Sequence, residues 1–75
     1  MKHLIEFRVS GNIEIERGGV ATRINIERGV QCAATVRCYV VHAKDAYTEV
    51  ADLEVEEGLV RALPCYAFMF IDRMD

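Results

Sequence analysis

The chain has 75 residues, 52% of them hydrophobic, and a formal net charge of −3. This length allows one domain over residues 1–75 with a single small core. The charge argues against a nucleic-acid partner, because such binding draws most of its affinity from phosphate neutralisation and the basic residues here are scattered beside acids.

The sequence also argues against a secretory signal and against a membrane partner. Glu6 and Arg8 interrupt any apolar segment near the start of the chain. No apolar run approaches the ~20 residues that a membrane-spanning helix needs. The three cysteines cannot all pair within one chain. Together these features predict a cytoplasmic protein with reduced thiols.

The N-terminal part of the sequence predicts a strand followed by a hairpin. Residues 3–9 alternate, with the odd-numbered positions facing inward. Residues 13–17 alternate again and lead to Gly18-Gly19, a pair that supplies the positive φ angles of a two-residue hairpin loop. This loop would set Ile13 opposite Ile24 on the apolar face, and Glu14 opposite Arg23 on the other face.

The segment Val30–Ala43 predicts a long central strand. It holds no glycine or proline and is rich in β-branched and aromatic residues. Its even-numbered residues form an apolar face that is expected to lie on the core. A three-residue loop at 28–30 would pair this strand with the preceding one and set Ile26 opposite Cys32.

Two further features follow this strand. A turn at Lys44-Asp45 would set Val36 opposite Leu53 and make residues 47–55 a fifth strand. The segment 54–63 fits either a hairpin turning at Glu57-Gly58 or a short helix that ends at Pro64; the glycine would cost that helix about 1 kcal/mol.

The last strand, Cys65–Ile71, is apolar on both faces, which predicts that either a helix or a second protein covers it. The fold class expected is therefore mainly β. We predict a small antiparallel meander sheet or a partly open barrel of four to six strands, with a short helix near 54–63 as the α+β alternative.

No catalytic, metal-binding or cofactor motif is present. Cys32 and Cys38 are six residues apart in one predicted strand, about 20 Å, so one zinc ion cannot bind both. Burial of Cys65 in an apolar run would raise the pKa of its thiol, which disfavours a nucleophile. A meander of this size also offers little cleft in which carboxylates could act as general acid and base. We expect no enzyme activity, metal or cofactor.

Two sets of residues are candidates for binding another protein. Arg37, Tyr39 and Val41 share the mixed face of the long strand, and Tyr and Arg are enriched at binding hot spots. The acidic residues Asp52, Glu54 and Glu56 share a face of the next strand and would engage a basic protein surface.

The sequence therefore predicts a small cytoplasmic module that acts by self-association or by docking on another protein, as an inhibitor or accessory protein. Phage-encoded accessory proteins are similar in size and charge only. The alternative is a small-molecule-binding domain with a pocket between the sheet and segment 54–63, where His42, Tyr47 and Cys38 would be the polar groups. A nucleic-acid-binding module is a third hypothesis, disfavoured by the charge.

Overall fold

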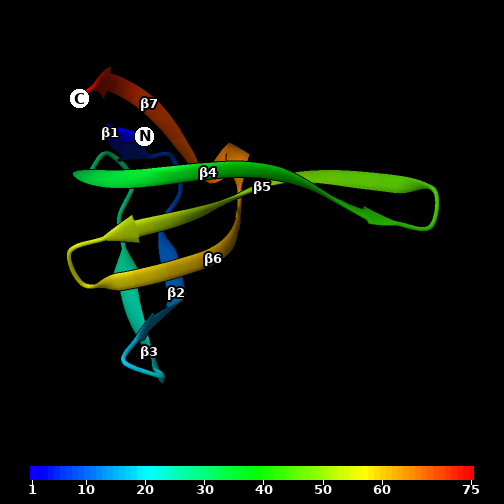
Figure 1. Ribbon diagram of the computed structural model, residues 1–75, viewed down its shortest axis with the longest axis horizontal. Helices are drawn as coiled ribbons and strands as arrows, with labels where there is room; N and C mark the ends of the chain where they lie inside the picture. Colours follow the sequence, from blue (N-terminus) through cyan, green and yellow to red (C-terminus); the bar gives the residue numbers. More distant parts are fainter.

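The computed structural model describes residues 1–75 and has seven antiparallel strands in one open sheet (Figure 1), which confirms the predicted mainly β class. The number of strands exceeds the four to six expected. The elements are β1 (Lys2–Phe7), β2 (Gly11–Arg17), β3 (Val20–Ile26), β4 (Gln31–Ala43), β5 (Ala46–Val55), β6 (Gly58–Pro64), the 3-10 turn η1 (Cys65–Ala67) and β7 (Phe68–Arg73). Their order across the sheet is β3-β2-β6-β5-β4-β1-β7.

The sheet curves around one core, with the β2–β3 hairpin running crosswise to β4, β5 and β6 (Figure 1). Ile5 and Leu53 are the largest side chains with no exposed surface. The core residues are Ile5, Phe7, Ile15, Ile26, Ala34, Ala51, Leu53, Val60, Leu63, Ala67 and Phe68. The structure contains no helix with the length and apolar character that crossing a membrane requires.

The β2–β3 hairpin has the predicted register. Ile13 lies opposite Ile24, and Glu14 lies opposite Arg23. Gly18 and Gly19 form the loop with φ angles of 59° and 80°. The glycine loop and the alternation of apolar residues, both local signals, are therefore sufficient to predict this register.

The β4–β5 hairpin is also confirmed, with Val36 opposite Leu53 and the turn at residues 44–45. The expectation that the whole even-numbered face of β4 lies on the core is wrong for its second half. Ala34 is buried, whereas Cys38, Val40 and His42 are exposed. The strand is longer than the core that it covers.

The outer part of this hairpin projects from the body of the protein (Figure 1). We call residues 41–48 the arm. No neighbouring strand supports it, because β1 pairs with β4 only as far as Thr35 and β6 pairs with β5 only from Val50 onward. Every residue of the arm is exposed.

The predicted pairing of β3 with β4 is wrong. Cys32 lies opposite Ile5 of β1, not opposite Ile26, and β3 is an outer strand of the sheet. The cause is a pair of backbone hydrogen bonds, in which Gly29 donates to the carbonyl of Phe7 and Phe7 donates to the carbonyl of Val30. They hold the loop after β3 against the end of β1. β4 then pairs with β1, and β3 and β4 remain unpaired with each other.

Segment 54–63 is a hairpin, and the helical alternative is wrong. The loop is Glu56-Glu57, one residue earlier than expected, and Gly58 pairs with Val55. β6 also lies against β2, where Glu16 pairs with Leu59. A Cβ atom at Gly58 would overlap the backbone oxygen of Glu16, so glycine is required for this close approach.

The segment 65–71 differs from the predicted covered strand. Its first three residues form η1, and β7 follows as an edge strand beside β1. Phe68 is buried, but Met69, Phe70 and Ile71 are 42%, 49% and 41% exposed. No helix covers β7; a second protein as its cover stays a prediction.

Candidate functional site

The six predicted site residues lie on β4, β5 and the turn after β5. Arg37 is directly opposite Asp52, and Thr35 is opposite Glu54, so the two sets that the sequence suggested separately meet on one surface. Val41 is the exception, because it lies in the arm opposite Thr48. This closeness follows from the predicted register, since a pairing of Val36 with Leu53 also pairs Arg37 with Asp52. The sequence therefore contained the signal for it.

Asp52 is the centre of a hydrogen-bonded cluster on this surface. Its carboxylate accepts from the Tyr39 hydroxyl at 2.8 Å and from the Arg37 guanidinium at 3.3 Å. The guanidinium lies 5.0 Å from the centre of the Tyr39 ring. The backbone N–H of Ala62 also donates to Asp52, at 2.9 Å. Asp52 is therefore satisfied within the chain and is not free to bind a partner.

The hydrogen bond from the backbone N–H of Ala62 explains why residue 52 is an acid. The register of β6 shifts opposite Asp52, where two residues of β6 face one residue of β5. Ala62 has a φ of 54°, which is uncommon for a residue with a side chain. The Asp52 carboxylate accepts the N–H that this bulge turns out of the strand ladder, so the cluster fixes the bulge.

The Asp52 cluster predicts a loss of stability in acid. The N–H of Ala62, more than the Tyr39 hydroxyl and Arg37, lowers the pKa of Asp52. The folded state therefore favours the ionised carboxylate, and this contribution is present above the unfolded pKa of about 3.9 and is lost as pH falls through the lower folded value. Asp52→Asn should lower the free energy of unfolding at pH 7 by about 1 kcal/mol and flatten its acid dependence.

Urea unfolding between pH 7 and pH 2.5 measures this effect. Asp45→Asn is the matched control, because Asp45 lies in the exposed turn of the arm. Equal acid dependence in the two variants would show that Asp52 does not stabilise the bulge through its charge.

Glu54 and Glu56 do not form a purely acidic patch with Asp52. They line a shallow polar hollow together with Lys2 and Thr35. A basic side chain is thus already present among them, which weakens the prediction that these acids engage a basic partner.

The cysteines show no sign of an activated thiol or of a metal site. Burial, with the Glu57 charge as a smaller cause, raises the pKa of Cys32. Burial also raises the pKa of Cys65, followed by the effect of the neighbouring Cys38 thiol. No three of the His, Cys, Asp and Glu side chains are grouped so as to hold a metal ion.

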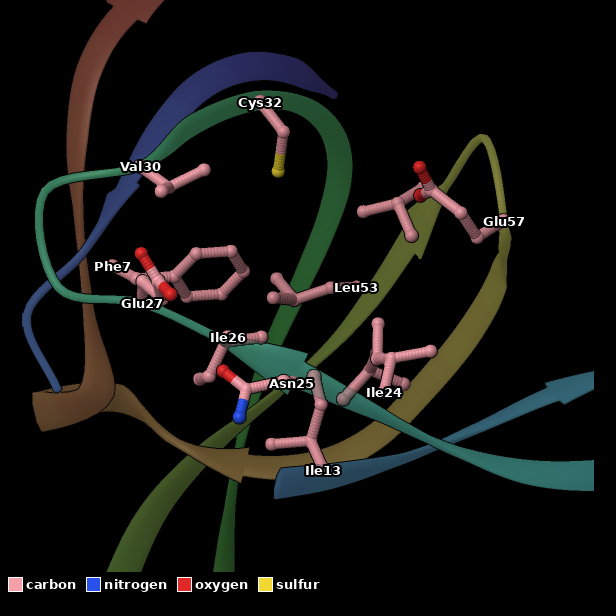
Figure 2. A pocket seen from close by; sticks show the side chains of 12 residues that line it. Phe7, Ile13, Ile24, Asn25, Ile26, Glu27, Val30, Cys32, Leu53 and Glu57 are labelled. Atoms are coloured by element: carbon pink, nitrogen blue, oxygen red, sulfur yellow. The ribbon is translucent and has the colours of Figure 1, made fainter. Parts of the chain in front are cut away.

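A cavity of about 480 Å³ opens beside the core, between β3 and β4 (Figure 2). Nine of its twelve lining residues are apolar, and Asn25, Glu27 and Glu57 are the polar ones. Figure 2 shows the Cys32 thiol pointing into the cavity above Leu53 and Ile26. The apolar lining consists of Phe7, Ile13, Ile24, Ile26, Val30, Cys32, Leu53, Val55 and Val60.

The cavity lies partly where the sequence predicted a pocket, because Val55, Glu57 and Val60 of segment 54–63 line it. The predicted polar groups were wrong. His42 and Tyr47 lie in the arm, with ring centres 6.3 Å apart, and Cys38 lines a different groove. The walls of the cavity could not be predicted from the sequence, because the expected pairing of β3 with β4 would leave no space between these strands.

That second groove lies at the base of the arm and has a volume of about 410 Å³. Its lining is mostly apolar, and Glu49 is its charged residue. Phe70 of β7, half exposed, forms one wall. The lining residues are Cys38, Tyr39, Val40, Glu49, Cys65 and Phe70.

Comparison of the chain with protein-family models, with curated proteins and with solved structures gives no match. The arm, the groove at its base and the apolar cavity are therefore the features that indicate a function.

Proposed function

We propose that the protein is a non-catalytic interaction module of the cytoplasm that works by self-association through the arm. The arm is the observation that supports this most directly. It is a two-stranded ribbon with both edges free and every residue exposed, and Tyr47 and Val41 are 67% and 44% exposed. An isolated two-stranded hairpin is only marginally stable in water. A second copy of the chain would cover these side chains and the unpaired backbone groups of the arm.

The groove at the base of the arm is the surface that we assign to the partner's arm. It combines an apolar lining with one charge, Glu49. Lys44 is exposed in the turn at the tip of the arm. Tyr47 and Val41 lie on its two strands, on opposite faces of the ribbon, because Tyr47 is paired with His42 and Val41 with Thr48. If the arm of each copy lies in the groove of the other, apolar side chains meet and Lys44 approaches Glu49. The contact is then the same on both copies, as in a two-fold symmetric dimer.

Sedimentation velocity over a wide range of concentrations tests the proposal. We expect a reversible change from one to two chain masses. Val41→Lys should weaken this association at least tenfold, because it places a charge in the apolar contact. Val20→Lys is the matched control, since Val20 is 62% exposed and is the first residue of β3. The β2–β3 hairpin lies far from the arm in Figure 1.

Two results would overturn the proposal. One is a mass of a single chain at every concentration. The other is equal weakening by Val41→Lys and Val20→Lys, which would mean that the added charge acts on the whole molecule and not at the arm.

A second candidate function is the binding of a small molecule. The observation that favours it is the apolar cavity between β3 and β4, whose volume of about 480 Å³ lies within the range of about 300–1,000 Å³ typical of ligand sites.

A further inference from the structure

The cavity is built into the fold by the unpaired gap between β3 and β4. Buried side chains form its floor, among them Leu53 at 0% and Ile26 at 5% exposure. Cys32 and Ile24 stand on the two strands that do not pair (Figure 2). The β1–β4 pairing and the hydrogen bonds of Phe7 hold these strands apart. The cavity is therefore largely preformed, as ligand sites usually are.

The charges of the cavity are all of one sign. Glu27 and Glu57 line it on different sides in Figure 2, and no Lys, Arg or His does. Neither glutamate forms an ion pair, whereas Glu16 and Asp52 are paired with arginines elsewhere on the surface. Burial and, as a smaller cause, the Glu57 charge raise the pKa of the Cys32 thiol, which points into the cavity in Figure 2. The site thus offers an apolar floor with uncompensated negative charge.

We propose that this cavity binds an amphipathic cation, an apolar chain or ring that carries a single protonated amine. The apolar part displaces water from the floor, and the ammonium group lies between Glu27 and Glu57. At about 30 Å³ per non-hydrogen atom, as for liquid water, the cavity holds a ligand of roughly fifteen atoms. The inference rests on the second function proposed above, small-molecule binding, and is independent of self-association.

An NMR titration of the full chain with n-octylamine and with 1-octanol separates the two parts of the inference. The two probes have the same apolar chain, and only the amine is charged at pH 7. We expect both probes to shift the amide resonances of residues that line the cavity, such as Ile24, Cys32 and Val55. We expect octylamine to bind about fivefold more tightly than octanol, the gain of partly exposed ion pairs.

Adjacent glutamates provide the matched variants. Glu57 lines the cavity, whereas Glu56, in the same two-residue turn, does not. Glu57→Gln should reduce the preference for octylamine over octanol several-fold, and Glu56→Gln should leave it unchanged. An equal loss in both variants would show that net charge, and not the cavity, selects the amine.

The remaining outcomes distinguish the two proposals. If octanol shifts the lining residues and octylamine binds no better, small-molecule binding stands and the preference for a cation is wrong. If neither probe shifts these residues up to its solubility limit, both are wrong. If the lining resonances of the free protein change with its own concentration, a second copy occupies the cavity, and the inference is overturned.

Discussion

Gly58→Ala is expected to lower the free energy of unfolding by about 3 kcal/mol. Gly58 has a φ of 145°, a region that residues with side chains rarely adopt. Its added Cβ would overlap the backbone oxygen of Glu16 and approach Cγ1 of Ile15 to 3.2 Å. Ile15 is a core residue with 3% exposure, so it cannot simply rotate away. β2 would have to move off β6.

The position of this contact explains why the effect should be large. Glu16 with Leu59 is the pairing that joins β2 to β6, and β3 is joined to the sheet only through β2. Displacing β2 therefore loosens the whole β2–β3 hairpin from the other five strands. Ile15 of β2 and Ile26 of β3 would leave the core together with this hairpin.

Gly11→Ala is the matched control for Gly58→Ala. Gly11 has a similar φ of 157°, but a Cβ atom there would meet no atom within 4 Å. This variant should cost only the backbone strain, about 1 kcal/mol. Urea unfolding of both variants measures the difference. If the two variants are equally destabilised, backbone strain alone makes glycine necessary at position 58, and the close approach of β2 to β6 contributes nothing.

The local hairpins could be predicted from the sequence because their signals lie within a few residues. Gly18-Gly19 fixes the loop between β2 and β3, and the alternating apolar residues choose one register out of two. The same logic gave the pairing of Val36 with Leu53 and, through it, the contact of Arg37 with Asp52. In each case a shift of one residue would expose the apolar face.

The pairings between distant segments could not be predicted in this way. β1 inserts between β4 and β7, and β6 inserts between β2 and β5. This order of strands depends on contacts such as the hydrogen bonds of Phe7 with Gly29 and Val30. No local sequence pattern predicts these contacts. The apolar cavity follows from the same choices. Ile26 and Cys32 looked like a cross-strand pair in the sequence, and instead they line the space between two unpaired strands.

Removal of the arm is expected to have a large effect on self-association and little effect on the stability of the monomer. Val40 lies directly opposite Glu49, so residues 41–48 can be replaced by Asn-Gly, a pair that forms a two-residue hairpin loop. No buried residue is lost, because every residue of the arm is exposed. We therefore expect the shortened protein to unfold within about 1 kcal/mol of the full chain when both are monomeric. It should no longer associate.

Thermal unfolding at several protein concentrations tests both statements together. Association stabilises the folded state by mass action, so the Tm of the full chain should rise with concentration, and the Tm of the shortened chain should stay constant. Replacing Gly18-Gly19 by Asn-Gly is the control for the new loop, since it leaves the arm intact. A shortened chain that fails to fold would show that the arm is needed for the fold of the monomer. One that still gains stability with concentration would move the interface to another surface, and the exposed edge of β7 would then be the first to test.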